Sequence, residues 1–231
     1  MNSNECKFSY NCLKFKSGEC KNDGEFCIRQ FKQDSLLSNA LLSDRQKEHR
    51  ELYLDNTKRD KDAYVSLKNI ETHIEQFVLN GKNLYIYSQI TGNGKTEWSL
   101  RMIQSYVHKI WHKSDIDCVC LFISVPKYLI ELKNNISKKS SYIDYIEENV
   151  AKADLVVFDD IGSKAGTEFE IEHLLSVIND RIDSGKSNIY TSNISPDNLE
   201  NVIGARLASR IIGMSTVINF VENDKRGHSS V

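Results

Sequence analysis

Residues 84–100 read LYIYSQITGNGKTEWSL and carry the strongest local signal in the chain. A short apolar run is followed by a loop with two glycines and then by a stretch with helical spacing. Glycines allow backbone N–H groups to close around phosphate oxygens, and the start of a helix adds the positive end of its dipole. A lysine there reaches the β- and γ-phosphates, and a threonine hydroxyl binds Mg²⁺. The segment predicts a nucleotide-binding loop made of Gly92, Asn93, Gly94, Lys95 and Thr96.

This loop departs from the full pattern G-x-x-x-x-G-K-[ST] at one position. The pattern has a glycine five residues before Gly94, where this chain has Gln89. A residue with a Cβ atom disfavours positive φ, so the loop must enter without it or tolerate strain at Gln89. The alternative interpretation is a glycine-rich turn that binds nothing, but the order strand, loop, helix favours nucleotide binding.

A second half of the site is predicted within residues 153–162, ADLVVFDDIG. Four apolar residues lead into Asp159 and Asp160, as expected for a buried strand that ends at a Mg²⁺ site. We expect Asp159 to hold Mg²⁺ through water together with Thr96, and Asp160 to orient or deprotonate the attacking water. Glutamate performs the second task more commonly, so the shorter side chain leaves the hydrolysis rate open. The alternative is a strand that ends in two solvated aspartates.

The chain after residue 81 alternates between strands and helices. A helix over residues 64–80 is expected to end at Gly81 as its C-cap. Further helices are expected at 95–112 and 168–182, and strands at 84–88, 118–124, 155–159, 188–192 and 216–221. This alternation indicates a parallel sheet covered by helices. The predicted fold is a three-layer α/β domain with a five-stranded parallel sheet.

Composition restricts the possible functions. The chain has 231 residues, with 30 Lys and Arg against 32 Asp and Glu, for a net charge of −2. Contact with nucleic acid would therefore need a local basic surface or an assembled ring. No apolar run approaches the roughly 18 residues of a membrane span, and the N-terminus lacks the apolar region of a signal peptide. We expect a cytoplasmic protein.

Four of the six cysteines lie within the first 27 residues, and the other two, Cys118 and Cys120, are expected in an apolar strand. A reducing cytoplasm disfavours disulfides, so clustered thiols favour a metal, and a tetrahedral zinc site takes four thiolates. Such a site replaces the core that a short segment cannot build. No C-x-x-C pair is present, and the alternative is four thiols on a loosely ordered tail. The predicted ligands of a structural Zn²⁺ are Cys6, Cys12, Cys20 and Cys27.

Several motifs in order resemble one known family. The segments GNGKT, VVFDDIG, NIYTSNISPDNLENVIGARLASRI and VINFVENDKRG resemble the AAA+ ATPases that load bacterial replicative helicases, of the DnaC/DnaI type, and phage-encoded members most of all. The resemblance covers roughly residues 65–231 and, more weakly, the Cys-bearing N-terminus. It implies an AAA+ ATPase domain over residues 61–231 that uses ATP and Mg²⁺. Residues 1–60 would form a Cys-rich module and helical connector that docks on the helicase.

The resemblance also assigns roles to individual residues. Asn193 matches sensor 1, which contacts the γ-phosphate or the attacking water. Arg210 matches the arginine finger that completes the ATP site of a neighbouring subunit, and Arg226 matches sensor 2, which reaches the nucleotide of its own subunit. Arg206 shares a helical face with Arg210. Each arginine could instead be an ordinary surface residue.

The family resemblance implies a loader that forms a ring or spiral, binds single-stranded DNA and deposits a hexameric helicase on it, with slow, DNA-stimulated ATP hydrolysis. Candidate DNA-binding residues combine cations with aromatic faces. They are Lys127, Lys133, Lys138, Lys139, Tyr128 and Tyr142, and the alternative is a solvated lysine-rich helix and loop. Three alternatives stay open: a transposition helper ATPase of the IstB type, a small-molecule P-loop kinase, and a nucleotide-gated adaptor without useful turnover.

Overall fold

The computed structural model describes residues 13–20, 27–48, 60–135 and 137–221. The N-terminal helices are α1 (Leu13–Lys16), α2 (Ile28–Asn39), α3 (Asp44–Lys47), α4 (Lys61–Thr72) and α5 (Ile74–Leu79). The alternating region follows, with β1 (Asn83–Tyr87), α6 (Lys95–Ile110), β2 (Cys120–Ser124), α7 (Val125–Asn135), α8 (Ser141–Asn149), β3 (Leu155–Asp159), α9 (Glu168–Asp183), β4 (Ser187–Ser192), α10 (Pro196–Ile203), α11 (Ala205–Gly213) and β5 (Ser215–Asn219). Within these ranges, no helix combines the length and apolar character needed to cross a bilayer.

The five predicted strands form one parallel sheet in the order β2-β3-β4-β1-β5. Strands β1 and β4 are adjacent at its centre, with Asn83 opposite Asn188 and Tyr87 opposite Ser192. The carboxyl ends of β1, β3 and β4 therefore meet at one edge of the sheet, where ligands of open parallel sheets bind. The predicted parallel sheet is confirmed.

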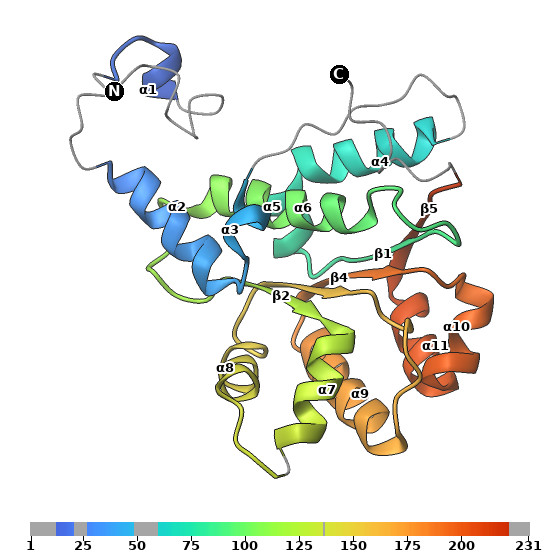
Figure 1. Ribbon diagram of the computed structural model, residues 1–231. Coiled ribbons are helices and arrows are strands. Elements are labelled where there is room, and N and C mark those ends of the chain that lie inside the picture. The colour runs from blue at the N-terminus through green and yellow to red at the C-terminus, as the bar shows by residue number, and fades with distance from the viewer. Residues whose placement is uncertain (1–12, 21–26, 49–59, 136, 222–231) are drawn as a thin grey trace.

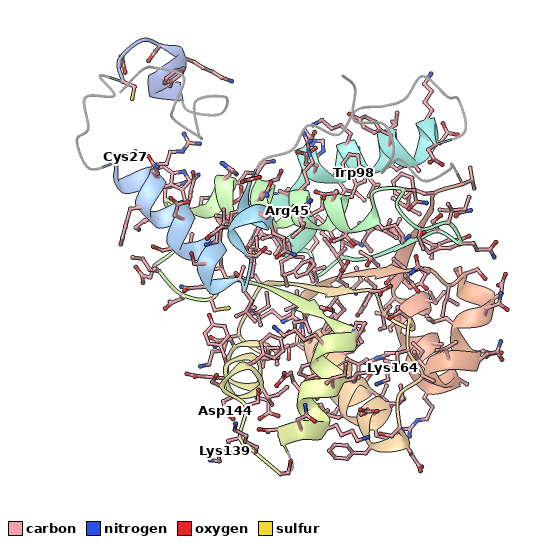
Figure 2. The ribbon with its side chains drawn as sticks, viewed as in Figure 1. Cys27, Arg45, Trp98, Lys139, Asp144 and Lys164 are labelled. Carbon is pink, nitrogen blue, oxygen red and sulfur yellow. The ribbon has the colours of Figure 1, made fainter. Side chains whose placement is uncertain are left out.

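Helices cover both faces of the sheet, as Figure 1 shows. Helices α2, α4, α5 and α6 lie on one face, and α7 to α11 lie on the other. Trp98 of α6 points toward α4, where its ring meets Tyr64 edge to face with centroids 5.2 Å apart (Figure 2). Two apolar cores, one on each side of the sheet, hold the predicted three-layer arrangement together.

The helix expected at 64–80 is two helices. The chain breaks at His73, whose φ of −109° and ψ of 27° lie outside the helical range. Gly81 ends the second helix as predicted, with a φ of 58°. A Cβ atom at Gly81 would lie 2.5 Å from the carbonyl oxygen of Gly185, so both the turn and the close approach require glycine.

Helix α2 packs into the core on one face of the sheet. Its Leu36 and Leu37, and Ala40 directly after it, are at most 2 % exposed and join the same apolar cluster as α6 and β1. The amide of Phe122 on the edge strand β2 donates to the carbonyl of Ala40 at 2.9 Å, so the end of α2 covers that edge. Helix α2 therefore packs against the α/β domain, and the predicted division at residue 60, between a Cys-rich module with its helical connector and the following domain, stays a prediction.

Candidate functional site

The predicted phosphate loop lies between β1 and α6. Gly92 and Gly94 have φ values of 80° and 94°, which disfavour any residue with a Cβ, and α6 begins at Lys95. Gln89 does not adopt positive φ. The loop therefore begins with a backbone conformation at position 89 that any residue can adopt, which explains why this position does not need a glycine.

A buried polar network holds the loop. The Asn93 side chain is 2 % exposed, and its Nδ2 donates to Oγ of the fully buried Ser88. The Ser88 oxygen also accepts from the amide of Ile90 at 3.1 Å. Lys95 Nζ donates to Asn93 Oδ1 at 3.2 Å and to the Ile90 carbonyl at 3.3 Å. These contacts keep the ammonium group of Lys95 at the loop.

Asp159 ends β3 and faces the phosphate loop. Its Oδ1 accepts hydrogen bonds from Thr96 Oγ1 at 2.9 Å and from Thr191 Oγ1 at 2.7 Å. Burial raises the pKa of Asp159, and the hydrogen bonds from Thr191 and Thr96 oppose that rise because they favour the charged form. Thr96 and Asp159 thus lie together, as predicted for a shared Mg²⁺ site.

Asp160 adopts a left-handed backbone conformation, with a φ of 61°. This region is uncommon for a residue with a Cβ atom and persists where surrounding contacts hold it. The Asp160 amide donates to Thr191 Oγ1 at 2.9 Å, and Asn193 Nδ2 donates to Asp160 Oδ1 at 3.0 Å. The predicted sensor Asn193 therefore contacts the second acidic residue directly.

A cleft of about 440 Å³ brings these groups together. The predicted residues that line it are Gly92, Asn93, Gly94, Lys95, Thr96, Asp159, Asp160 and Asn193. Thr91, Glu97 and Thr191 also line it and were not predicted. Alternate residues of a strand share a side, so the position of Thr191 two residues before Asn193 was the available signal.

The chemistry of the cleft fits ATP and Mg²⁺. The loop offers backbone N–H groups at a helix N-terminus and the cation of Lys95 for phosphate oxygens. Thr96 and Asp159 offer the hydroxyl and carboxylate oxygens that Mg²⁺ takes alongside water and phosphate. Asp160 and Asn193 add an acceptor and an amide donor on the other wall. The residues present therefore suit a nucleoside triphosphate bound with a divalent cation.

Arg210 and Arg206 do not line this cleft. Both lie on α11, where Arg210 pairs with Asp183 at the end of α9 and Arg206 lies 3.5 Å from Glu172. Asp183 lies just before the first residue of β4. Arg210 therefore reaches toward the amino ends of the strands, whereas the phosphate loop lies at their carboxyl ends. An arginine in that place cannot serve the cleft of its own subunit, and its assignment as a finger in trans stays a prediction.

Other predicted residues lie outside the described part of the chain. These are Arg226, the sensor 2 candidate, and the zinc ligands Cys6 and Cys12. The remaining two ligands, Cys20 and Cys27, carry free thiols, and Cys27 is exposed at the start of α2 (Figure 2). The four-thiolate zinc site stays a prediction.

The predicted DNA-binding residues divide by exposure. Tyr128 is 1 % exposed and its hydroxyl lies 2.8 Å from His173 Nε2, so its proposed role as a stacking platform is wrong. The Nζ atom of Lys127 lies 4.2 Å from the ring centroid of Tyr142, a cation–π contact. Lys139 is exposed in the α7–α8 connection, away from the sheet (Figure 2). Lys133 and Lys138 are also exposed.

Comparison with protein families gives one match. The family described as the bacterial DnaA ATPase domain matches residues 57–217, more than half of the chain. This range contains every residue of the cleft described above. No match was found among curated protein sequences.

Solved structures share the fold. The DnaC helicase loader aligns with a TM-score of 0.62 and 18 % identity, covering 77 % of this chain and 99 % of that one. DnaI aligns with a TM-score of 0.58 and 18 % identity, covering 77 % and 94 %. The replication initiator DnaA bound to AMPPCP and single-stranded DNA aligns with a TM-score of 0.55 and 19 % identity, covering 74 % and 49 %. The predicted AAA+ fold is confirmed.

Proposed function

This chain belongs to the bacterial DnaA ATPase-domain family, and from that premise we propose that it is an AAA+ ATPase that loads a hexameric replicative helicase onto single-stranded DNA. The observation that carries the ATPase part is the meeting of Lys95, Thr96, Asp159, Asp160 and Asn193 in one cleft. Each of these residues supplies a function that phosphoryl transfer needs: phosphate binding, metal binding, and control of the attacking water.

The reaction proposed is the hydrolysis of ATP. Water attacks the γ-phosphorus, the bond from that phosphorus to the β,γ-bridging oxygen breaks, and ADP and inorganic phosphate leave. Asp160 accepts the proton of the attacking water or orients that water, and Asn193 holds the Asp160 carboxylate. Lys95 neutralises charge on the phosphates, while bound Mg²⁺ would supply further electrostatic stabilisation beside Thr96 and Asp159.

The loading part of the proposal draws on similarity. The DnaC helicase loader shares the fold over most of this chain, and a DnaA structure of the same fold holds AMPPCP and single-stranded DNA. In the ATP state, the chain would assemble into a ring or spiral in which Arg210 completes the site of the next subunit. Exposed lysines on α7 and in the α7–α8 connection would line the DNA path. The Cys-rich N-terminal segment, with its proposed zinc, would contact the helicase in the bacterial cytoplasm.

Lys95→Ala tests the ATPase. Loss of the ammonium group removes the cation that contacts the phosphates, so ATP binding and hydrolysis should both fall to background. The matched control is Lys152→Ala, which removes an exposed lysine 3.8 Å from Glu148 on the surface, and this variant should match the native protein. Hydrolysis that survives in Lys95→Ala would contradict the assignment of the cleft.

Co-purification with the replicative helicase of the host tests the loader. Capture that depends on ATP, together with hydrolysis stimulated by single-stranded DNA, supports the proposal. Preference for duplex DNA and a transposase would indicate a transposition helper ATPase instead. Transfer of the γ-phosphate to a nucleoside would indicate a small-molecule kinase.

A further inference from the structure

The hydroxyl of Thr191 contacts both acidic residues of the cleft. Thr191 belongs to β4 and is 1 % exposed. Its Oγ1 lies 2.7 Å from Asp159 Oδ1 and 2.9 Å from the backbone nitrogen of Asp160. One buried side chain thus connects the acid at the Mg²⁺ site with the acid next to the attacking water.

The direction of both hydrogen bonds follows from chemistry. The Asp160 amide can only donate, so Thr191 Oγ1 accepts there. The single hydroxyl proton is then free to point at Asp159, whose carboxylate accepts it. Both roles of the hydroxyl are therefore in use, and its orientation is set without any ligand.

The contact lies where backbone pairing between β3 and β4 ends. The ladder of these strands runs from Leu155 opposite Ser187 to Phe158 opposite Tyr190. One residue further along β4, the Thr191 hydroxyl accepts from the Asp160 amide in place of a backbone carbonyl. The amide of Ile161 donates to the Thr191 carbonyl at 2.9 Å. These two contacts, at the amides of Asp160 and Ile161, flank the Cα atom of Asp160. Thr191 therefore holds the backbone on both sides of the atom that carries the Asp160 side chain.

These contacts matter because the backbone of Asp160 is in the left-handed conformation. Residues with a Cβ atom uncommonly adopt positive φ, and the φ of Asp160 is 61°. Asn193 binds the Asp160 carboxylate, the Ser163 amide donates to the Asp160 carbonyl at 3.3 Å, and Thr191 accepts from the Asp160 amide. Without the Thr191 hydroxyl, the Asp160 amide loses a buried acceptor, and the left-handed turn loses one of the hydrogen bonds that stabilise it.

We propose that Thr191 is a positioning residue for ATP hydrolysis. Its hydroxyl orients the Asp159 carboxylate toward Mg²⁺, and its contact with the Asp160 backbone holds the Asp160 carboxylate next to the attacking water. The proposal rests on the ATP hydrolysis proposed above. Glutamate is more common at this position and has a longer side chain. Because Thr191 holds the turn that carries Asp160, the shorter aspartate side chain is also held in place.

Three variants of the full chain test the proposal. Thr191→Val keeps the β-branched shape and removes the hydroxyl, and Thr191→Ser keeps the hydroxyl. Thr216→Val makes the same change at an exposed threonine of β5, outside the cleft. The measurements are kcat and KM for ATP, the affinity for AMPPCP at saturating Mg²⁺, the Mg²⁺ concentration that gives half-maximal AMPPCP binding, and the melting temperature.

We expect Thr191→Val to lower kcat by about 10- to 100-fold, the usual loss when a partner of a metal ligand is removed. It should also raise the Mg²⁺ midpoint, while KM and AMPPCP affinity at saturating Mg²⁺ stay near native values. Thr191→Ser should restore both quantities, and Thr216→Val should leave them unchanged.

Other outcomes overturn the proposal. Native kcat and Mg²⁺ midpoint in a folded Thr191→Val would show that the hydroxyl positions nothing. If Thr191→Ser fails to restore either quantity, or if the losses only follow the melting temperature, the role of Thr191 is structural. A native protein that hydrolyses no ATP would refute the proposed function alone, because the Mg²⁺ midpoint of AMPPCP binding still tests Thr191.

Discussion

Arg181→Met offers a quantitative test of what holds the sheet together. Arg181 lies on α9 and is 1 % exposed, and burial lowers the pKa of its guanidinium to about 10, so the group is charged at neutral pH. It donates to the carbonyls of Val150, Ala153 and Ser187 and to Asn188 Oδ1. These acceptors precede or begin β3 and β4, the two strands that bring Asp159, Asp160 and Asn193 to the cleft.

The magnitude follows from the number of acceptors. A buried group that loses its partner costs about 1–3 kcal/mol, and four acceptors lose theirs here. Removal of the buried charge offsets part of the cost, because the guanidinium no longer has to be desolvated. We expect a loss of about 4 kcal/mol in the free energy of unfolding, which lowers the melting temperature by roughly 10 °C in a chain of this size.

The assay is thermal and urea unfolding followed by circular dichroism. The matched control is Lys186→Met, since Lys186 pairs with Asp154 at 2.8 Å on the surface, and such pairs contribute about 0–1 kcal/mol. Arg181 lies at the edge of the sheet opposite the phosphate loop, so AMPPCP affinity measured well below the melting temperature should be unchanged. A melting temperature no lower in Arg181→Met than in Lys186→Met would refute the reasoning.

Three further predictions follow from the packing and charges. Burial acts to raise the pKa of Glu71, but hydrogen bonds from Lys68 and Arg101 outweigh it and hold that pKa below 4.5; Glu71→Gln should therefore be less stable than the native protein at pH 7, with the difference in unfolding free energy fading as pH falls below about 4.5, and a difference independent of pH contradicts this. Deletion of residues 1–60 removes the buried Leu36 and Leu37 of α2 and should lower the melting temperature more than deletion of residues 1–27, which keeps them; equal values would contradict the assignment of α2 to the core. Arg210→Ala should abolish the rise in ATPase rate per subunit with protein concentration, while Arg206→Ala, which loses only an exposed pair, should retain more of it; an unchanged concentration dependence in Arg210→Ala rules out a finger in trans.

The phosphate loop and the positions of the strands were accessible from sequence for a local reason. The loop conformation depends on glycines at two positions and on the helix that starts at Lys95, and these neighbours in sequence are neighbours in space. Buried parallel strands are continuous apolar runs, so their positions could be found without knowing how they pair. The break at His73 was not visible, because the apolar spacing of the two helices runs across it.

Contacts between distant segments required the tertiary structure. Sequence alone placed Asp159 and Asn193 on separate strands, and only the pairing of β3 with β4 shows that Thr191 bridges two acids more than 30 residues away. The burial of Tyr128 and the packing of α2 likewise depend on segments far along the chain. The sequence by itself predicted which groups are suited to bind phosphate and metal, since that prediction depends on local backbone geometry and residue chemistry. The fold decided how the carboxylates are held, because long-range hydrogen bonds form only after the sheet has brought its strands together.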